Sequence, residues 1–311
     1  MKEVLPVDIL GILSKIGVLF LILAVGYLAN RCGVFTQDGA RMLSRLVLNV
    51  TLPAYLLANA MDGAALALSD VGLMLFLGLG QNLLLFLLAW LWPKLCRVPA
   101  PQVGTYRFMI AFPNVGFIGY PVVAAVLGSE AVLAASLFTL PFNLLVYAVG
   151  IPMVSSGQSH GFDPKILRAP PVIASVLAAI LALLPVTWPA PLVDTCQMLG
   201  SMTTPGALLV IGSTLAEVPL RQLAGSPRLY LLTLSRLVLI PLLVWALLRP
   251  WLTDPVALGV AVLLSGMPVA SNGTMFCLTY GGDQKLMSQG TFLTTLLSLL
   301  TIPLMALLLQ L

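Results

Sequence analysis

Charged residues are scarce in this sequence. Only 8% of its 311 residues are Asp, Glu, Lys or Arg, whereas 59% are hydrophobic. Soluble domains carry about 25% charged residues, so the chain lacks the charged surface that a water-soluble fold needs. Apolar stretches of roughly 20 residues, each long enough to cross the ~30 Å hydrocarbon core of a bilayer, recur along almost the whole length. The composition therefore predicts an all-α integral membrane protein that resides in the lipid bilayer.

Residue combinations for catalysis and metal binding are also missing. The one histidine, His160, lies in a polar connection, which excludes a histidine proton relay. The four cysteines show no CxxC or other metal-ligand spacing, so we expect them to be packing residues without a disulfide. An intramembrane protease or lipid transferase needs an acid pair, a metal cluster or a Ser–Lys dyad at mid-depth, and none is visible. We expect no enzyme, no metal and no cofactor.

The basic balance of the chain does not indicate nucleic-acid binding. The net charge is +4 and the isoelectric point is about 9.0. The cations fall in pairs between apolar stretches, however, and no basic stripe alternates with aromatic residues. Placement of cations at the cytoplasmic membrane surface explains them more simply.

Ten membrane-spanning helices are predicted, joined by short connections. They cover residues 9–30, 41–61, 69–93, 104–128, 130–154, 168–185, 194–216, 228–250, 255–280 and 286–310. The longest polar interruption, 155–167, is predicted to be a cytoplasmic linker. It divides the chain into an N-terminal half, 1–154, and a C-terminal half, 168–311.

The cations also predict the orientation. If the N-terminus lies outside, eleven of the fifteen Lys and Arg residues fall at inner span ends, and only Lys2 and Arg249 at outer ends. The opposite orientation would reverse this bias, so both termini are expected on the non-cytoplasmic side. The remaining two cations, Lys15 and Arg236, lie within predicted spans.

The two halves repeat a set of features in the same order. Thr-x-Pro occurs at Thr51–Pro53 and again at Thr203–Pro205. A further proline follows 60 residues after Pro53, at Pro113, and 63 residues after Pro205, at Pro268. Five spans in each repeat would insert the second copy upside down. Inverted repeats are typical of secondary transporters, whose substrate sites lie near the membrane midplane at the repeat interface.

The prolines at 113 and 268 are predicted to break their helices rather than merely kink them. Each removes a backbone donor inside a span, and each is followed by Asn, Gly or Ser residues that favour unwinding. The second half of each helix would then begin in mid-membrane, where its free N–H groups could hold an anion. The competing interpretation is that both only kink packed helices, as we expect of Pro141, Pro241 and Pro303. The predicted substrate site includes Pro113, Asn114, Val115, Gly116, Pro268, Ser271, Asn272 and Gly273.

Four other polar residues are candidates for the same cavity. Asn49, Thr51 and Asn143 could line it or could serve only as hydrogen-bond partners between helices. For Arg236, in the eighth span, the preferred interpretation is a side chain that snorkels to the inner headgroups. The alternative is contact with substrate, because intramembrane charges are usually functional. Gln81 and Asn82 in the third span are expected to be packing residues.

Four segments resemble the auxin efflux carrier family, including its bacterial permease members. They are GYLANRCGVF (Gly26 to Phe35), LVLNVTLP (Leu46 to Pro53), PNVGFIGYP (Pro113 to Pro121) and MPVASNGT (Met267 to Thr274). The resemblance covers essentially the whole chain, but the long cytoplasmic loop of the plant members is absent. It identifies Pro113 and Pro268 as the family's crossover prolines and Asn114 as its crossover asparagine. A bacterial inner-membrane location follows from the resemblance.

The resemblance implies two inverted five-helix repeats with broken, crossing helices four and nine. These helices would lie in a mobile transport domain, with helices one, two, six and seven as scaffold and helices two and seven as a homodimer surface. Known family substrates are organic anions, namely indole-3-acetate in plants and malonate or malate in some bacteria. We therefore expect a secondary transporter of a small organic anion, working by elevator-like alternating access.

The residues alone leave two points open. A sodium-coupled bile-acid-type symporter has the same crossed-helix architecture, but its sodium sites need carboxylate or amide oxygens, and this crossing contains no acid. Proton coupling is the other open point, because Glu130, Glu217 and Asp283 all lie near span ends. Either one of these carboxylates takes part in proton coupling, or transport is uncoupled from protons.

Overall fold

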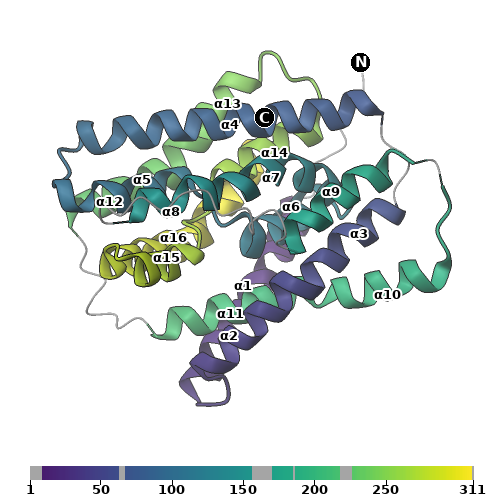
Figure 1. Ribbon diagram of the computed structural model, residues 1–311, viewed down its shortest axis with the longest axis horizontal. Coiled ribbons are helices and arrows are strands. Elements are labelled where there is room, and N and C mark those ends of the chain that lie inside the picture. The colour runs from purple at the N-terminus through teal and green to yellow at the C-terminus, as the bar shows by residue number, and fades with distance from the viewer. Residues whose placement is uncertain (1–8, 63–66, 156–169, 185, 218–225, 310–311) are drawn as a thin grey trace.

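The computed structural model describes residues 9–62, 67–155, 170–184, 186–217 and 226–309 (Figure 1). In these ranges it contains helices and no strand. Five helical segments are long and apolar enough to cross a membrane, namely Ser14–Arg31, Leu68–Leu95, Ala190–Glu217, Pro227–Leu248 and Gln284–Leu308. The all-helical membrane class is thus confirmed. Most of the expected linker, including His160, lies outside the described residues.

One group of helices is built around the first and seventh predicted spans. Its members are α1 (Ile9–Arg31), α2 (Gln37–Leu46), the π-helical turn η1 (Val47–Thr51), α3 (Leu52–Asp62), α9 (Pro170–Ala182), α10 (Ala190–Ser201) and α11 (Thr203–Glu217). Within this group α1 packs along α11, and α3 packs against both α9 and α10. We call it the α1–α11 group.

A second group contains the interrupted helices. Its members are α4 (Leu68–Leu95), η2 (Ala100–Gln102), α5 (Val103–Ala111), η3 (Val115–Gly119), α6 (Tyr120–Leu127), α7 (Ala131–Ala148), α8 (Gly150–Val154), α12 (Pro227–Leu234), η6 (Ser235–Leu239), α13 (Ile240–Leu248), α14 (Pro255–Ser265), α15 (Asn272–Tyr280) and α16 (Gln284–Leu308). Here α4 packs on α5 and α7, α13 on α14, and α15 on α16. We call it the crossing group. It meets the α1–α11 group where α9 and α3 contact α7, where α1 contacts α6 and α16, and where α11 contacts η3.

Glycines set the close approach of α1 to α11. A Cβ atom on Gly26 would overlap the carbonyl oxygen of Leu209, and one on Gly212 would overlap that of Leu23. Small residues allow membrane helices to approach this closely, and backbone packing then supplies the attraction that lipid-embedded helices do not gain from the hydrophobic effect.

The structure separates prolines that helices tolerate from prolines that end them. Pro141 and Pro303 lie inside the continuous helices α7 and α16, and Pro241 is the second residue of α13. Around Pro113 and Pro268, by contrast, helical structure stops: α5 ends at Ala111, and α14 ends at Ser265. The distinction drawn from the sequence is therefore confirmed.

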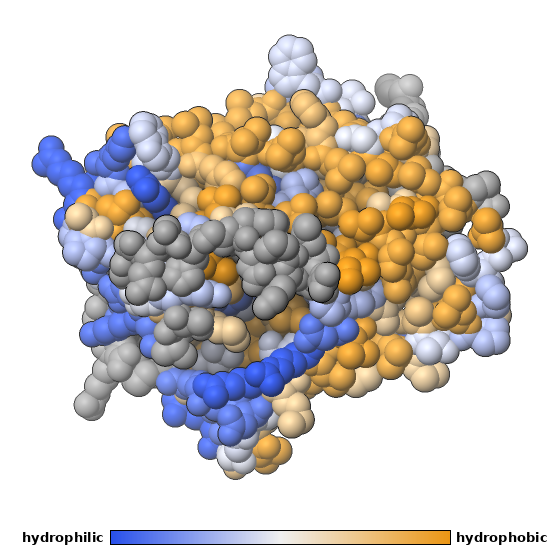
Figure 2. Space-filling model, in the orientation of Figure 1, coloured by the Kyte–Doolittle hydropathy of each residue, from blue (hydrophilic) through white to orange (hydrophobic). Residues whose placement is uncertain are grey.

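The surface has the polarity of a membrane protein. Figure 2 shows broad apolar surface over the middle and right of the molecule, with hydrophilic residues gathered at its left end and lower left. Large apolar side chains are exposed on the long helices, among them Leu21, Phe76 and Leu300. Such a surface is unfavourable in water and favourable in a lipid bilayer.

Candidate functional site

The two helix breaks cross and hydrogen-bond to each other. Pro113 and Val269 form an isolated antiparallel bridge. The Asn114 backbone N–H donates to the Pro268 carbonyl at 2.8 Å, and the Ala270 N–H donates to the Phe112 carbonyl at 3.0 Å. Unwound backbone in a membrane protein has no water or helical partner, so its polar groups must be satisfied within the protein. Each break supplies partners to the other. We call this region, residues 110–116 and 267–273, the crossing.

A threonine of α16 satisfies one further backbone group of the crossing. The Val269 N–H donates to Thr294 Oγ1 at 3.1 Å, and Thr294 itself donates to the Gly290 carbonyl at 2.7 Å within its own helix. Thr294 is fully buried. No sequence signal singles out Thr294, because α16 contains several threonines in similar apolar surroundings.

We expect Thr294→Val to destabilise the protein by about 1–3 kcal/mol, because the buried Val269 N–H loses its acceptor while the side-chain shape is kept. The measurement is thermal unfolding of the detergent-purified protein. Ser298→Ala is the matched control, since its buried hydroxyl donates only to the Thr295 carbonyl of the same helix and should cost less. Equal losses in both variants would contradict this role of Thr294.

Arg236 contacts the backbone of the crossing and lies in the protein interior. It is 0% exposed. Its Nε donates to the Met267 carbonyl at 3.1 Å and its Nη1 to the Ile110 carbonyl at 2.9 Å. These carbonyls stand in the last turn of α5 and just beyond α14, where helices leave acceptors without partners. The prediction that Arg236 snorkels is therefore wrong: the guanidinium is held in the interior by two carbonyls.

The helices that begin after the two breaks, η3 and α15, start at residues that face each other. Asn114 is the N-cap of η3, and its Oδ1 accepts from the Phe117 N–H at 3.2 Å. Its Nδ2 donates to Ser271 Oγ at 3.5 Å, and Ser271 is the N-cap of α15. The next residue, Asn272, has a buried Oδ1 with no hydrogen-bond partner among the described residues. Two helix N-termini thus meet inside the protein: Asn114 caps η3 through its side chain, whereas Ser271 precedes α15 without a side-chain capping bond.

The two glycines predicted for the site have different surroundings. A Cβ added to Gly116 meets no atom within 4 Å, so open space adjoins it. A Cβ on Gly273 would lie 2.6 Å from Phe108 Cε1 and 2.8 Å from Met287 Sδ, so this glycine serves close packing. Val115 is buried, and its N–H donates to the Pro113 carbonyl at 3.0 Å.

The remaining predicted residues bond outside the crossing. Thr203 donates to Thr51 across the α1–α11 group at 3.0 Å, which links the two Thr-x-Pro segments. Asn49 is exposed and donates to the Arg45 carbonyl of its own helix at 2.8 Å.

Polar residues of the third and fifth spans form their own contacts. Asn143 interacts with the Tyr120 hydroxyl, which also bonds Thr139 at 2.6 Å. Gln81 and Asn82 are buried in α4, as expected of packing residues, and Asn82 donates to the Gly78 carbonyl at 2.7 Å.

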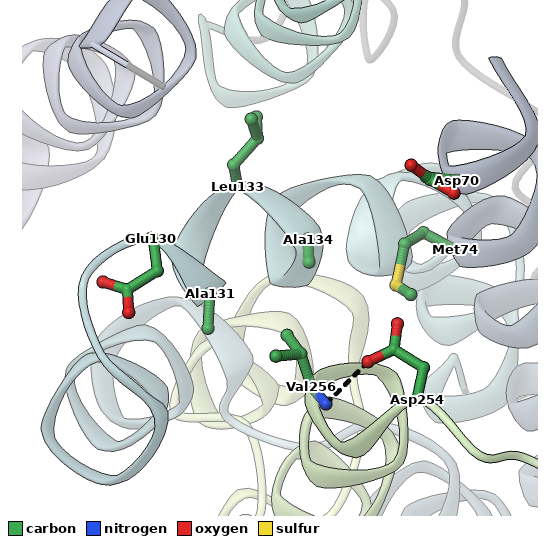
Figure 3. Close-up of a pocket in the computed structure, with 8 residues that line it drawn as sticks. All are labelled: Asp70, Met74, Glu130, Ala131, Leu133, Ala134, Asp254 and Val256. Atoms are coloured by element: carbon green, nitrogen blue, oxygen red, sulfur yellow. Dashed lines mark hydrogen bonds between the residues drawn. The ribbon is translucent and has the colours of Figure 1, made fainter. Parts of the chain in front are cut away.

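A pocket of about 220 Å³ lies away from the crossing, at the starts of α4, α7 and α14 (Figure 3). Its acids are Asp70, Glu130 and Asp254, and Glu130 points away from the other two in the figure. Asp254 is the N-cap of α14 and accepts from the Val256 N–H at 2.9 Å. Acids at helix N-termini stabilise the helices. Because the pocket collects negative charge, it is unsuited to an organic anion.

Apolar helices and a lipid-compatible surface define a multi-pass membrane protein, and broken helices that cross in the interior are typical of secondary transporters. The sequence profile of the family described as "Membrane transport protein" matches residues 12–162 and 162–306. The chain belongs to this family, the auxin efflux carrier family, and the resemblance noted in the sequence is confirmed.

Relatives from archaea and bacteria match most of the chain. An uncharacterised transporter of Methanothermobacter thermautotrophicus is 26% identical over 94% of this chain and 96% of its own length. A Rhizobium meliloti protein named "Putative malonate transporter" is 25% identical over 94% of this chain and 92% of its own length. An uncharacterised transporter of Escherichia coli K12 is 26% identical over 82% of this chain and 84% of its own length.

Proposed function

We propose that this protein is a secondary transporter that moves a small organic anion, a mono- or dicarboxylate, across the cytoplasmic membrane. The observation that carries the proposal is the meeting of two helix N-termini at Asn114 and Ser271. Each helix N-terminus is equivalent to roughly half a positive charge. Their donors, the asparagine amides and the Ser271 hydroxyl suit a carboxylate, and the open space beside Gly116 gives it room.

The proposed topology is ten spans in two inverted five-helix repeats, 1–154 and 168–311, with both termini on the non-cytoplasmic side. The matching Thr-x-Pro segments and the paired breaks support it, as does the hydrogen bond from Thr203 to Thr51. In this scheme the α1–α11 group is the scaffold, and the crossing group carries the anion past it in an elevator-like movement. Helices of the second and seventh spans would form a homodimer.

Malonate is the first substrate to test, because the Rhizobium meliloti relative is named "Putative malonate transporter". A carboxylate series tested by thermal shift would identify the substrate class. Ligand at about 100-fold over Kd stabilises the protein by about 2.7 kcal/mol. Absence of stabilisation by every carboxylate tested would count against the proposal.

Gly116→Ala tests the location of the site. The added methyl group enters open space, so the fold should keep its stability or gain up to about 1 kcal/mol from the better helix propensity of alanine. Carboxylate affinity should fall at least about tenfold, as one methyl group in a binding pocket commonly costs. Gly80→Ala is the matched control, because Gly80 also faces open space but lies in α4 on the protein surface. Unchanged affinity in Gly116→Ala would place the anion elsewhere.

A further inference from the structure

Two helices end at the crossing as well as begin there. The carbonyl ends of α5 and α14 meet at Arg236, which bonds Ile110 and Met267. Among the described residues the one ion pair is Arg41–Asp38 on the surface. Arg236 therefore has no carboxylate partner there, and its Nη2 is buried without a hydrogen-bond acceptor.

Four helix ends with opposite partial charges meet at the crossing. Each carbonyl end is equivalent to about half a negative charge and each N-terminal end to about half a positive charge. Two of each would sum to roughly zero, and such a site would gain little by binding an anion unless a cation entered with it. The guanidinium of Arg236 cancels the two carbonyl ends. The two N-terminal ends then remain, with about one positive charge between them.

We propose that Arg236 is a built-in counter-cation of the crossing, which holds the carbonyl ends of α5 and α14 and thereby lets the site bind a carboxylate without sodium. This inference rests on the proposed function, since it assumes that the anion binds at the crossing. Arg236 acts as a positioning residue. Its guanidinium occupies the Ile110 and Met267 carbonyls, so neither carbonyl is left to a free cation.

The test measures the malonate affinity of purified wild type, Arg236→Gln and Arg236→Lys, each in a sodium salt and in the corresponding choline salt. Wild type should bind malonate equally well in the two salts. Arg236→Gln should bind at least about tenfold more weakly, because a charged hydrogen-bond donor to two carbonyls is lost. Guanidinium chloride at about 20 mM, far below the molar concentrations that unfold proteins, should restore part of that affinity.

Arg236→Lys keeps the charge and should retain sodium-independent binding. Arg45→Gln, which removes an exposed charge, is the control.

The outcomes separate this inference from the proposed function. If wild type binds no carboxylate, the proposed function fails. The role of Arg236 is then judged by whether guanidinium raises the unfolding temperature of Arg236→Gln but not of Arg45→Gln. If wild type binds malonate only with sodium present, or if folded Arg236→Gln binds as tightly as wild type, the inference is overturned. If Arg236→Gln does not fold, Arg236→Lys decides: retained binding supports the inference, and lost binding in a folded protein overturns it. If neither folds, the sodium test on wild type decides.

Discussion

Asn114→Asp is expected to abolish carboxylate binding and uptake while leaving the fold intact. Aspartate caps a helix as well as asparagine does, so its carboxylate can still accept the Phe117 N–H that Asn114 Oδ1 now accepts. It also places a negative charge beside the bound anion. At about 4 Å and an effective dielectric constant of about 20, that repulsion is about 4 kcal/mol, or close to a thousandfold in affinity.

The measurements are uptake into proteoliposomes and malonate affinity in detergent. Asn59→Asp is the matched control, because the Asn59 amide bonds only the Tyr55 carbonyl of its own helix α3. The control should keep wild-type affinity. Full activity of Asn114→Asp would show that the anion does not approach the start of η3.

Gly26→Ala is expected to destabilise the α1–α11 group by about 1–3 kcal/mol, the usual cost of overpacking. The new methyl group would lie 2.8 Å from Leu209 Cα and overlap the neighbouring carbonyl oxygen, which forces α1 away from α11. Backbone atoms of a helix cannot move aside as a side chain can, so the two helices must separate.

Gly17→Ala on the same helix is the control, since a Cβ on Gly17 meets no atom within 4 Å. It should leave the unfolding temperature unchanged or raise it, because alanine favours helix. Thermal unfolding of both variants, without ligand, provides the comparison. A Gly26→Ala variant as stable as Gly17→Ala would contradict the close packing of α1 on α11.

The breaks in the fourth and ninth spans could be predicted because their causes are local. Pro113 and Pro268 each remove a donor, and the Asn, Gly and Ser residues that follow supply caps and weaken the helix. The apolar length of the spans likewise depends on nearby residues only. These features are therefore present in the sequence before any tertiary contact forms.

The partners of the breaks could not be predicted, because they come from distant segments. Arg236 and Thr294 are brought to the crossing by the packing of η6 and α16, and nothing near them in the chain indicates their carbonyl and N–H partners. The sequence alone made snorkelling of Arg236 reasonable. For the same reason it did not distinguish Gly116, beside open space, from Gly273, packed on Phe108.

A structure of the protein determined with saturating malonate, in the absence of sodium, tests whether the anion binds where the two broken helices cross. We expect density for the carboxylate between Asn114 and Ser271, beside Gly116 and within hydrogen-bond distance of the asparagine amide. Malonate bound in the acidic pocket at Asp70 and Asp254, or at any place away from the crossing, would contradict it.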